Sequence, residues 1–212
     1  MQIRYFRRAR AALCFTLLVF FAACTPADNP YTKIQNPPLV QARLSTMTVL
    51  ATADNLAADL ATRGYPATTF ASNYPASVRV EAGLWHLPED VVAQTRYFIA
   101  SSGPSIRLVV GLLPPDVPAV DASVERDFYR NVLGADVPHW PANVPRPDNA
   151  RVHGWTFFIP SVVEARNKFR EHNIAIDFAP VAITTAYLGD HKTMGIRAPD
   201  GAVIELVESA AQ

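Results

Sequence analysis

Cysteine is nearly absent from this chain, which has only Cys14 and Cys24 among its 212 residues. Cys14 lies in an N-terminal apolar segment that we expect to be removed, so the mature protein would keep one thiol and no internal disulfide. Charged residues are also sparse, at 18%, whereas hydrophobic residues make up 50%. This composition excludes a disordered chain and predicts a packed globular core.

Sequence motifs of several enzyme classes are missing as well. The chain has no Gly-rich phosphate loop, no His-Glu-x-x-His, no Gly-x-Ser-x-Gly and no paired-cysteine zinc motif. Nucleotide hydrolysis, metalloprotease and esterase functions therefore have no basis in the sequence. The basic residues form no stripe of the kind that binds nucleic acid, so we expect no nucleic-acid partner.

The N-terminus is basic and then apolar. The segment MQIRYFRRAR carries Arg4, Arg7, Arg8 and Arg10 and no acid, and the thirteen residues AALCFTLLVFFAA follow it. At about 1.5 Å per residue, that apolar segment would reach only about 20 Å, which is short for a membrane span. Residues 1–23 therefore predict a cleaved signal peptide. Its removal leaves fifteen basic against nineteen acidic residues, a net charge of −4.

The segment ends FAAC, and this ending resembles the lipobox of bacterial lipoproteins, although Phe21 stands where Leu is usual. The resemblance implies that Cys24 carries a lipid that anchors the protein to a membrane of the bacterial cell envelope, facing the periplasm or the exterior. Ordinary secretion with cleavage after Ala27 is the alternative. Residues 24–41 include four prolines and predict a semi-extended tether.

The remaining chain contains two copies of one pattern. ARLSTMTVLAT (42–52) and ARVHGWTFFIP (150–160) both predict a strand, and a helical segment follows each. The first helix has Leu56 and Leu60 on its apolar face and Gly64 at its end. The second opens with a Ser161–Glu164 capping box and ends at Asn173. The two copies also end alike, because FIASSGPSIRLVV (98–110) matches IRAPDGAVIELVE (196–208).

Each copy has room for two further strands between its helix and its last strand. We place them at 67–72 and 77–85 in the first copy, and at 176–180 and 183–189 in the second. The prediction is an α+β fold of two paired βαβββ modules, 42–112 and 150–209, that together form a concave mixed sheet. The linker 113–149 holds a helix at 121–134.

Two segments, HGWTFFIPSVVEARNKFREHNIAI and GIRAPDGAVIELVE, resemble the vicinal oxygen chelate superfamily, which includes glyoxalase I, extradiol dioxygenases and bleomycin-resistance proteins. The resemblance implies that His153 and Glu205 hold one divalent metal, Fe, Mn, Zn or Ni, and that Glu205 is also catalytic. Ala198 departs from the family pattern, which has Asp at this place in the turn.

Strand alternation places Ile204 and Leu206 on one face and Glu205 on the other. The same alternation groups His153 with Trp155 and Phe157, a plausible lining for an apolar cup. In the first module, however, the repeat aligns Ser45 with His153 and Arg107 with Glu205. Neither residue is a good metal ligand, so the predicted metal site is incomplete.

Several functions stay open at this point. Arg107 could pair with Glu205, or bind a carboxylate or phosphate of a ligand. The ligand-binding candidates are Arg107, Trp155, Phe157, Tyr187 and His191. One hypothesis is a binding module for a small oxygenated or polar molecule, and the other is a metal-dependent lyase, isomerase or dioxygenase acting on vicinal oxygens. A structural partner protein is a third, and a homodimer is a further expectation.

Overall fold

The structure, a computed structural model, describes residues 28–34, 36–52, 55–68, 75–100, 103–111, 119–142, 144, 146–185 and 187–208. The chain divides into two compact units, Met1–Pro30 and Tyr31–Gln212. Of the first unit only residues 28–30 are described, so the predicted signal peptide and Cys24 lie outside the described residues. Within the described ranges, no helix is long and apolar enough to cross a membrane.

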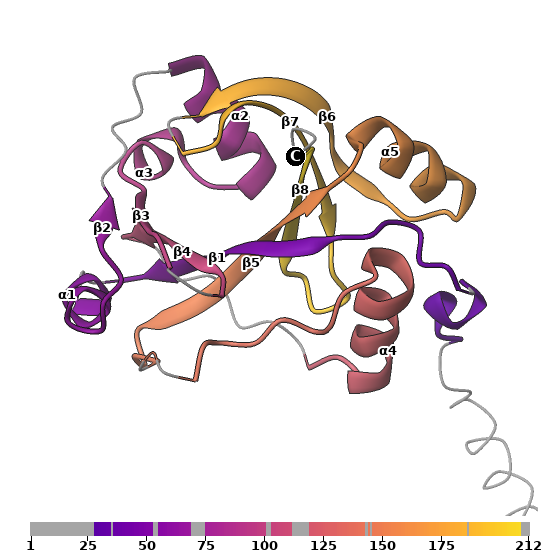
Figure 1. Cartoon of the computed structure of the whole chain (residues 1–212), viewed down its shortest axis with the longest axis horizontal. Coiled ribbons are helices and arrows are strands. Elements are labelled where there is room, and N and C mark those ends of the chain that lie inside the picture. Colours follow the sequence, from indigo (N-terminus) through magenta and orange to yellow (C-terminus); the bar gives the residue numbers. More distant parts are fainter. Residues whose placement is uncertain are drawn as a thin grey trace, which may run out of the picture. The chain divides into compact units, whose positions relative to one another are not determined.

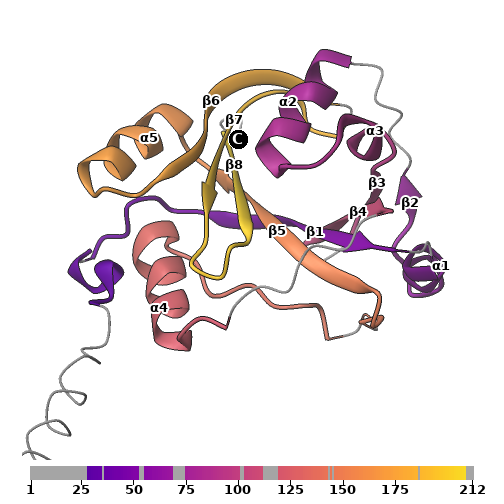
Figure 2. The ribbon, with the colours of Figure 1, turned by 180° about the vertical axis from the view of Figure 1, so that it is seen from behind.

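Eight strands of the second unit form one mixed sheet in the order β2-β3-β4-β1-β5-β8-β7-β6 (Figures 1 and 2). The first four are β1 (Arg43–Ala51), β2 (Ala67–Thr68), β3 (Arg96–Phe98) and β4 (Ser105–Val110). The other four are β5 (Ala150–Ile159), β6 (Ile176–Thr185), β7 (Gly189–Arg197) and β8 (Val203–Glu208). At the centre β1 pairs antiparallel with β5, and each pairs parallel with the last strand of its own module. The predicted pair of βαβββ modules is confirmed.

The helices are α1 (Asn55–Thr62), α2 (Pro75–Trp85), α3 (Glu89–Val92), α4 (Ala122–Asp127) and α5 (Val162–Glu171). A 3-10 turn η1 (Pro30–Lys33) precedes the sheet, and a π-helix η2 (Phe128–Leu133) continues α4. Helix α5 begins as predicted, because the Ser161 side chain accepts a hydrogen bond from the Glu164 backbone N–H. It ends next to Asn173, whose φ is 58°.

One face of the sheet is apolar and carries the larger core. Inward side chains from the central strands, such as Met47, Ile106, Phe157 and Leu206, are fully buried there. They pack with buried residues of α1, η2 and α5, including Leu56, Leu60, Phe128, Tyr129, Val162 and Phe169. The alternation predicted for β8 is confirmed, since Ile204 and Leu206 belong to this core whereas Val203 joins the opposite one.

The segment 77–85 is not a strand, as predicted, but most of helix α2. Its buried positions Val78, Ala82 and Trp85 follow the i, i+4, i+7 spacing of a helix, and Pro75 stands at the first helical residue, where proline is favoured. The third strand of the first module is instead β3. In the second module, β6 covers the segment predicted at 176–180 and ends at Thr185, within the segment predicted at 183–189. Strand β7 begins at Gly189 and was not predicted as a separate strand.

The tether predicted at 24–41 is also shorter than expected, because its residues from Tyr31 onward belong to the second unit. Ile34, Leu39 and Val40 are buried, and the Leu39 and Val40 backbone N–H groups donate to carbonyls of Asn131 and Val132 in η2. Apolar side chains within the proline-rich stretch explain this packing, since their burial offsets the ordering of the chain.

Helices α2 and α3 lie on the opposite face of the sheet, and we call residues 75–92 the roof. Val78, Ala82, Leu84 and Trp85 of α2 form a second, smaller core with Leu50, Val109 and Val203 of the sheet. Strand β6 arches over α2 (Figure 1). Phe178 of β6 lies against Gly83, where an added Cβ would come within 3.3 Å of its ring. The roof is therefore held between the sheet and this strand.

Candidate functional site

The sheet face beneath the roof is polar at its centre, and we call this region the cup. Thr46, Thr48, Arg107, Thr156, Thr193 and Glu205 are all buried there, with exposed fractions of 0–5%. They alternate with the apolar residues of the larger core along β1, β4, β5, β7 and β8. Buried polar groups are costly unless they are paired, so such a concentration is typical of a functional site.

Two central strand pairs place Arg107 and Glu205 at equivalent positions of the repeat. Arg107 on β4 pairs with Thr48 on β1, and Glu205 on β8 pairs with Thr156 on β5. Thr48 and Thr156 are the residues that follow Ser45 and His153 by three positions, so the observed register matches the predicted alignment. The first module thus contributes a cation where the second contributes a carboxylate.

Glu205 is held by hydroxyl groups of the sheet. Thr156 Oγ1 donates to Glu205 Oε2 at 2.8 Å, and Thr193 Oγ1 donates to Oε1 at 3.2 Å. Both donors come from strands next to β8. The interruption of the apolar strand by Glu205 therefore marks a carboxylate fixed in the cup and not a solvated outer face.

Arg107 pairs with a residue that the sequence did not single out. Its Nη2 donates to Glu81 Oε2 of α2 at 2.7 Å, and the two side chains are 3% and 13% exposed. The predicted alternative, a direct pair with Glu205, is replaced by this bond, although the Glu205 charge still acts on Arg107. The guanidinium carbon lies 4.8 Å from the Trp85 ring centroid and 5.8 Å from that of Tyr97.

The charges of the cup shift one another's pKa values. Burial lowers the pKa of Arg107, but Tyr97, Glu81 and Glu205 outweigh it and raise that pKa, so the guanidinium stays charged. Burial raises the pKa of the Glu81 carboxyl, Arg107 lowers it and Glu205 raises it, with a net increase. Burial also raises the pKa of the Tyr97 hydroxyl. With both carboxylates ionised, Arg107 faces one more negative charge than it can neutralise.

These groups border a small cavity between the sheet, the roof and the β6–β7 turn. Its volume of about 10 Å³ leaves room for about one water molecule. Its lining consists of Thr46, Glu81, Tyr97, Arg107, Thr156, Thr185, Tyr187, Leu188, His191 and Glu205. Tyr187 stacks on Tyr97 with ring centroids 4.5 Å apart. Among the predicted ligand-binding residues, Arg107, Tyr187 and His191 thus meet in one place.

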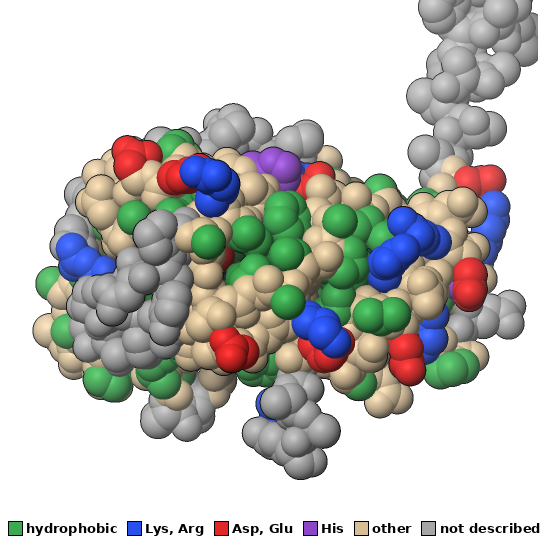
Figure 3. Space-filling model, turned by 90° about the horizontal axis from the view of Figure 1, so that it is seen from above, with side chains coloured by type: hydrophobic (Ala, Val, Ile, Leu, Met, Phe, Trp, Pro, Cys, Tyr) green, Lys and Arg blue, Asp and Glu red, His purple; other side chains and the backbone are tan. Residues whose placement is uncertain are grey.

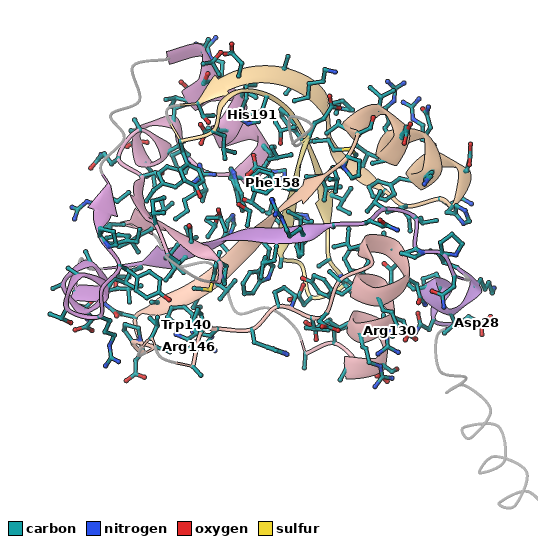
Figure 4. The ribbon with its side chains drawn as sticks, in the orientation of Figure 1. Asp28, Arg130, Trp140, Arg146, Phe158 and His191 are labelled. Carbon is teal, nitrogen blue, oxygen red and sulfur yellow. The ribbon has the colours of Figure 1, made fainter. Side chains whose placement is uncertain are left out.

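Two buried polar atoms at this cavity have no hydrogen-bonding partner among the described residues, Arg107 Nε and His191 Nε2. His191 lies at the end of the sheet next to α2 (Figure 4), and its Nδ1 is 2.9 Å from the Gly189 carbonyl oxygen. Because a carbonyl only accepts, Nδ1 is assigned the proton, and an imidazole with its one proton on Nδ1 has an acceptor at Nε2. One atom therefore lacks an acceptor and the other lacks a donor.

The predicted partners of His153 are wrong. A β-bulge lies at this residue, because Thr48 pairs with Gly154 while Val49 pairs with Val152, and the extra residue changes the alternation. Trp155 and Phe157 belong to the larger core on the other side of the sheet and line no cup. His153 is directed toward α2, where Nε2 donates to the Trp85 carbonyl at 2.7 Å.

The residues present do not fit the divalent metal that the family resemblance implies. His153 uses Nε2 for a backbone carbonyl, Glu205 is bonded by two threonines, and the Arg107 charge would repel a cation. Across the described ranges, no group of three or more His, Cys, Asp or Glu side chains is arranged to hold a metal ion. Burial, with smaller effects of Arg107, Arg197 and His86, lowers the pKa of His153.

A second, wider groove lies between α5 and β6, on an exposed part of the chain. It is lined by Arg166, Arg170, Ile174, Ile176, Ala179 and Pro180 and encloses about 490 Å³. Figure 3, which looks down on Figure 1 from above, shows hydrophobic side chains gathered next to Lys and Arg. The cup is the stronger candidate because it combines buried charges with unpartnered polar atoms.

No protein-family model matches the sequence, and no curated protein matches it. Among solved structures, the chain is similar to methylmalonyl-CoA epimerase from Mycobacterium tuberculosis, with a TM-score of 0.43 and 12% identity over 84% of this chain and 93% of that one. It is similar to a methylmalonyl-CoA epimerase from Streptomyces coelicolor, with a TM-score of 0.43 and 14% identity over 81% and 99%.

A virulence protein from Salmonella typhimurium is also similar, with a TM-score of 0.26 and 15% identity over 78% of this chain and 94% of that one. At these identities and scores, none of the three likenesses carries an argument about function. The fold rests on the strand order and the function on the cup.

Helical spacing could have revealed Glu81 from the sequence. Val78, Glu81, Ala82 and Trp85 follow i, i+3, i+4 and i+7, so one carboxylate interrupts the apolar face of a helix just as Glu205 interrupts a strand. Glu81 was missed because the segment that forms α2 was predicted as a strand. Tyr97 had no comparable signal.

Proposed function

We propose that the protein is a binding module that holds a small oxygenated or polar molecule in the cup without a metal ion. The observation that carries the proposal is the pair of buried, unpartnered atoms, Arg107 Nε and His191 Nε2, at one cavity. A ligand with an oxygen acceptor and a hydrogen-bond donor would satisfy both. Arg107 would supply a fixed positive charge, and Glu205 and the threonines would orient the rest.

Ligand binding can be tested on the full chain purified in detergent. Thermal unfolding would be followed with glycolate, lactate, pyruvate, dihydroxyacetone, acetamide and phosphate, with sodium chloride at matched ionic strength as the reference. We expect at least one probe to raise the melting temperature in a concentration-dependent way. The shift should be smaller in His191→Asn than in the wild type and unchanged in His172→Asn, because His172 is exposed at the end of α5. Shifts that both variants keep would place binding elsewhere and contradict the proposal.

We further propose that Cys24 carries a lipid and holds this module at a membrane of the cell envelope. The support is the basic and apolar segment that ends FAAC, together with the proline-rich residues after it. A lipid chain anchors by burying CH₂ groups, each contributing roughly 0.8 kcal/mol. Fractionation of cells that express wild type and Cys24→Ser is the test. Release of the variant from membranes is expected, and retention equal to wild type would contradict lipidation.

A further inference from the structure

Arg107 is a cation whose position is fixed before any ligand arrives. Its side chain is 3% exposed, and its guanidinium lies near the faces of Trp85 and Tyr97. These rings come from two different elements, the roof and β3. Because the group cannot turn out into water without leaving both rings, an anion must come to it.

Glu81 is the anion now paired with Arg107, and it belongs to the roof and not to the sheet. Polar contacts tie the roof to β5 and β6, among them the bond from His153 Nε2 to the Trp85 carbonyl. The Ser77 hydroxyl donates to the Thr184 carbonyl of β6, and His86 Nε2 lies 2.7 Å from an Asp177 carboxylate oxygen, also on β6. The His86–Asp177 contact is exposed. Glu81 thus occupies Arg107 as a ligand's carboxylate would, from a side chain of the roof and not of the sheet.

The unpartnered atoms define what such a ligand needs next to its carboxylate. Arg107 Nε requires a second acceptor, and His191 Nε2 requires a donor. A carboxylate with a hydroxyl group on the adjacent carbon has both. A carboxylate also matches Glu81 in shape and single negative charge, so the replacement leaves the charge balance with Glu205 unchanged. A doubly charged phosphate would add repulsion from Glu205.

We propose that the cup binds a short 2-hydroxycarboxylate that takes the place of Glu81 on Arg107, with its hydroxyl donating to His191. This inference rests on the proposed function and names the ligand class of that same site. Glu81 acts as a built-in competitor. The present cavity has room for about one water molecule, so the ligand enters only when Glu81 withdraws. The apparent affinity of the wild type is therefore reduced by the fraction of molecules in which Glu81 has withdrawn.

The experiment removes the competitor and adds small carboxylates back. The full chain carrying Glu81→Ala would be compared with Glu89→Ala, because Glu89 lies in the same roof and pairs with Arg79 on the surface at 3.3 Å. Thermal unfolding and calorimetric titration would use glycolate, acetate, acetamide and chloride. Glycolate and acetate should raise the melting temperature of Glu81→Ala by about 3–5 °C at about ten times the dissociation constant. Glu89→Ala should show only the smaller shift of the wild type, because Glu81 still competes in it.

Two comparisons refine the result. Glycolate should bind Glu81→Ala on the order of tenfold more tightly than wild type, because the competitor is gone. Adding His191→Phe should abolish the advantage of glycolate over acetate while acetate still binds. If Glu81→Ala does not fold, Glu81→Gln takes its place, and a larger stabilisation by acetate than by chloride is again expected.

The outcomes separate this inference from the proposed function. If acetamide stabilises Glu81→Ala and the carboxylates act no better than chloride, the carboxylate inference is wrong and the binding module stands. If no probe acts on wild type or on either Glu81 variant, both fall. Equal stabilisation of Glu89→Ala by acetate would show a nonspecific salt effect and overturn the inference.

Discussion

Replacing Arg107 by methionine should be the most damaging single change in the cup. Arg107→Met removes the guanidinium that pairs with Glu81 and whose charge acts on Glu205. Both carboxyl groups then stay in a buried site without that cation. Breaking a buried ion pair from one side costs about 3–5 kcal/mol, because the remaining charge stays desolvated. For a chain of this size, such a loss lowers the melting temperature by roughly 6–20 °C.

The cost should also depend on pH. The pKa of Glu81 is already raised in the folded protein, chiefly by burial, and the loss of Arg107 removes the group that lowers this pKa most. A carboxyl with a raised folded pKa favours folding below its unfolded pKa, near 4.5, and this contribution is lost as the pH rises through the folded pKa. The variant should therefore recover part of its stability on acidification from pH 7.5 toward pH 5.

Urea unfolding followed by circular dichroism at both pH values is the assay. Arg79→Met is the matched control, because Arg79 pairs with Glu89 on the surface and is 80% exposed, so its loss should cost less than about 1 kcal/mol. A loss below about 1 kcal/mol for Arg107→Met at pH 7.5, or the same loss at both pH values, would refute the reasoning about buried charge.

Three further predictions concern other parts of the fold. Burial lowers the pKa of His153, so its neutral form adds stability above about pH 6.5, and this stability is lost as the pH falls. In urea unfolding, the free energy of unfolding should therefore decline less steeply with falling pH in His153→Gln than in the wild type, and equal slopes would contradict this. Gly154→Ala places a Cβ 2.1 Å from the Val203 carbonyl oxygen and 2.8 Å from the Trp85 ring, and should destabilise by about 1–3 kcal/mol in the same assay; a neutral effect would show that β8 can shift. Ser161→Ala removes the N-cap of α5 and should cost about 1 kcal/mol, whereas Ser161→Asp should retain most of it.

The sequence predicted the paired modules because the patterns that carry them are local. The capping box at Ser161, the apolar faces of α1 and α5, and the alternation around Glu205 each depend on spacing within one element. The repeat then related Arg107 to Glu205, and the sheet register agrees with that alignment.

The rest of the cup could not be placed by strand alternation. The bulge at His153 places Trp155 and Phe157 on the opposite face of the sheet from His153. The alternation of residue types along a strand does not reveal a bulge of one residue. The roof was predicted as a strand, so Glu81 was not placed opposite Arg107. The helical spacing of that segment was present in the sequence, and its packing under β6 was not.

The central claim is that the cup binds its ligand through Arg107 and without a metal ion. Its most direct test is a calorimetric titration of glycolate into Glu81→Ala, with and without prior EDTA treatment. The predicted result is the same dissociation constant in both samples, with no gain on adding Mn²⁺, Fe²⁺, Zn²⁺ or Ni²⁺. Binding that disappears with EDTA and returns with one of these ions would contradict the account.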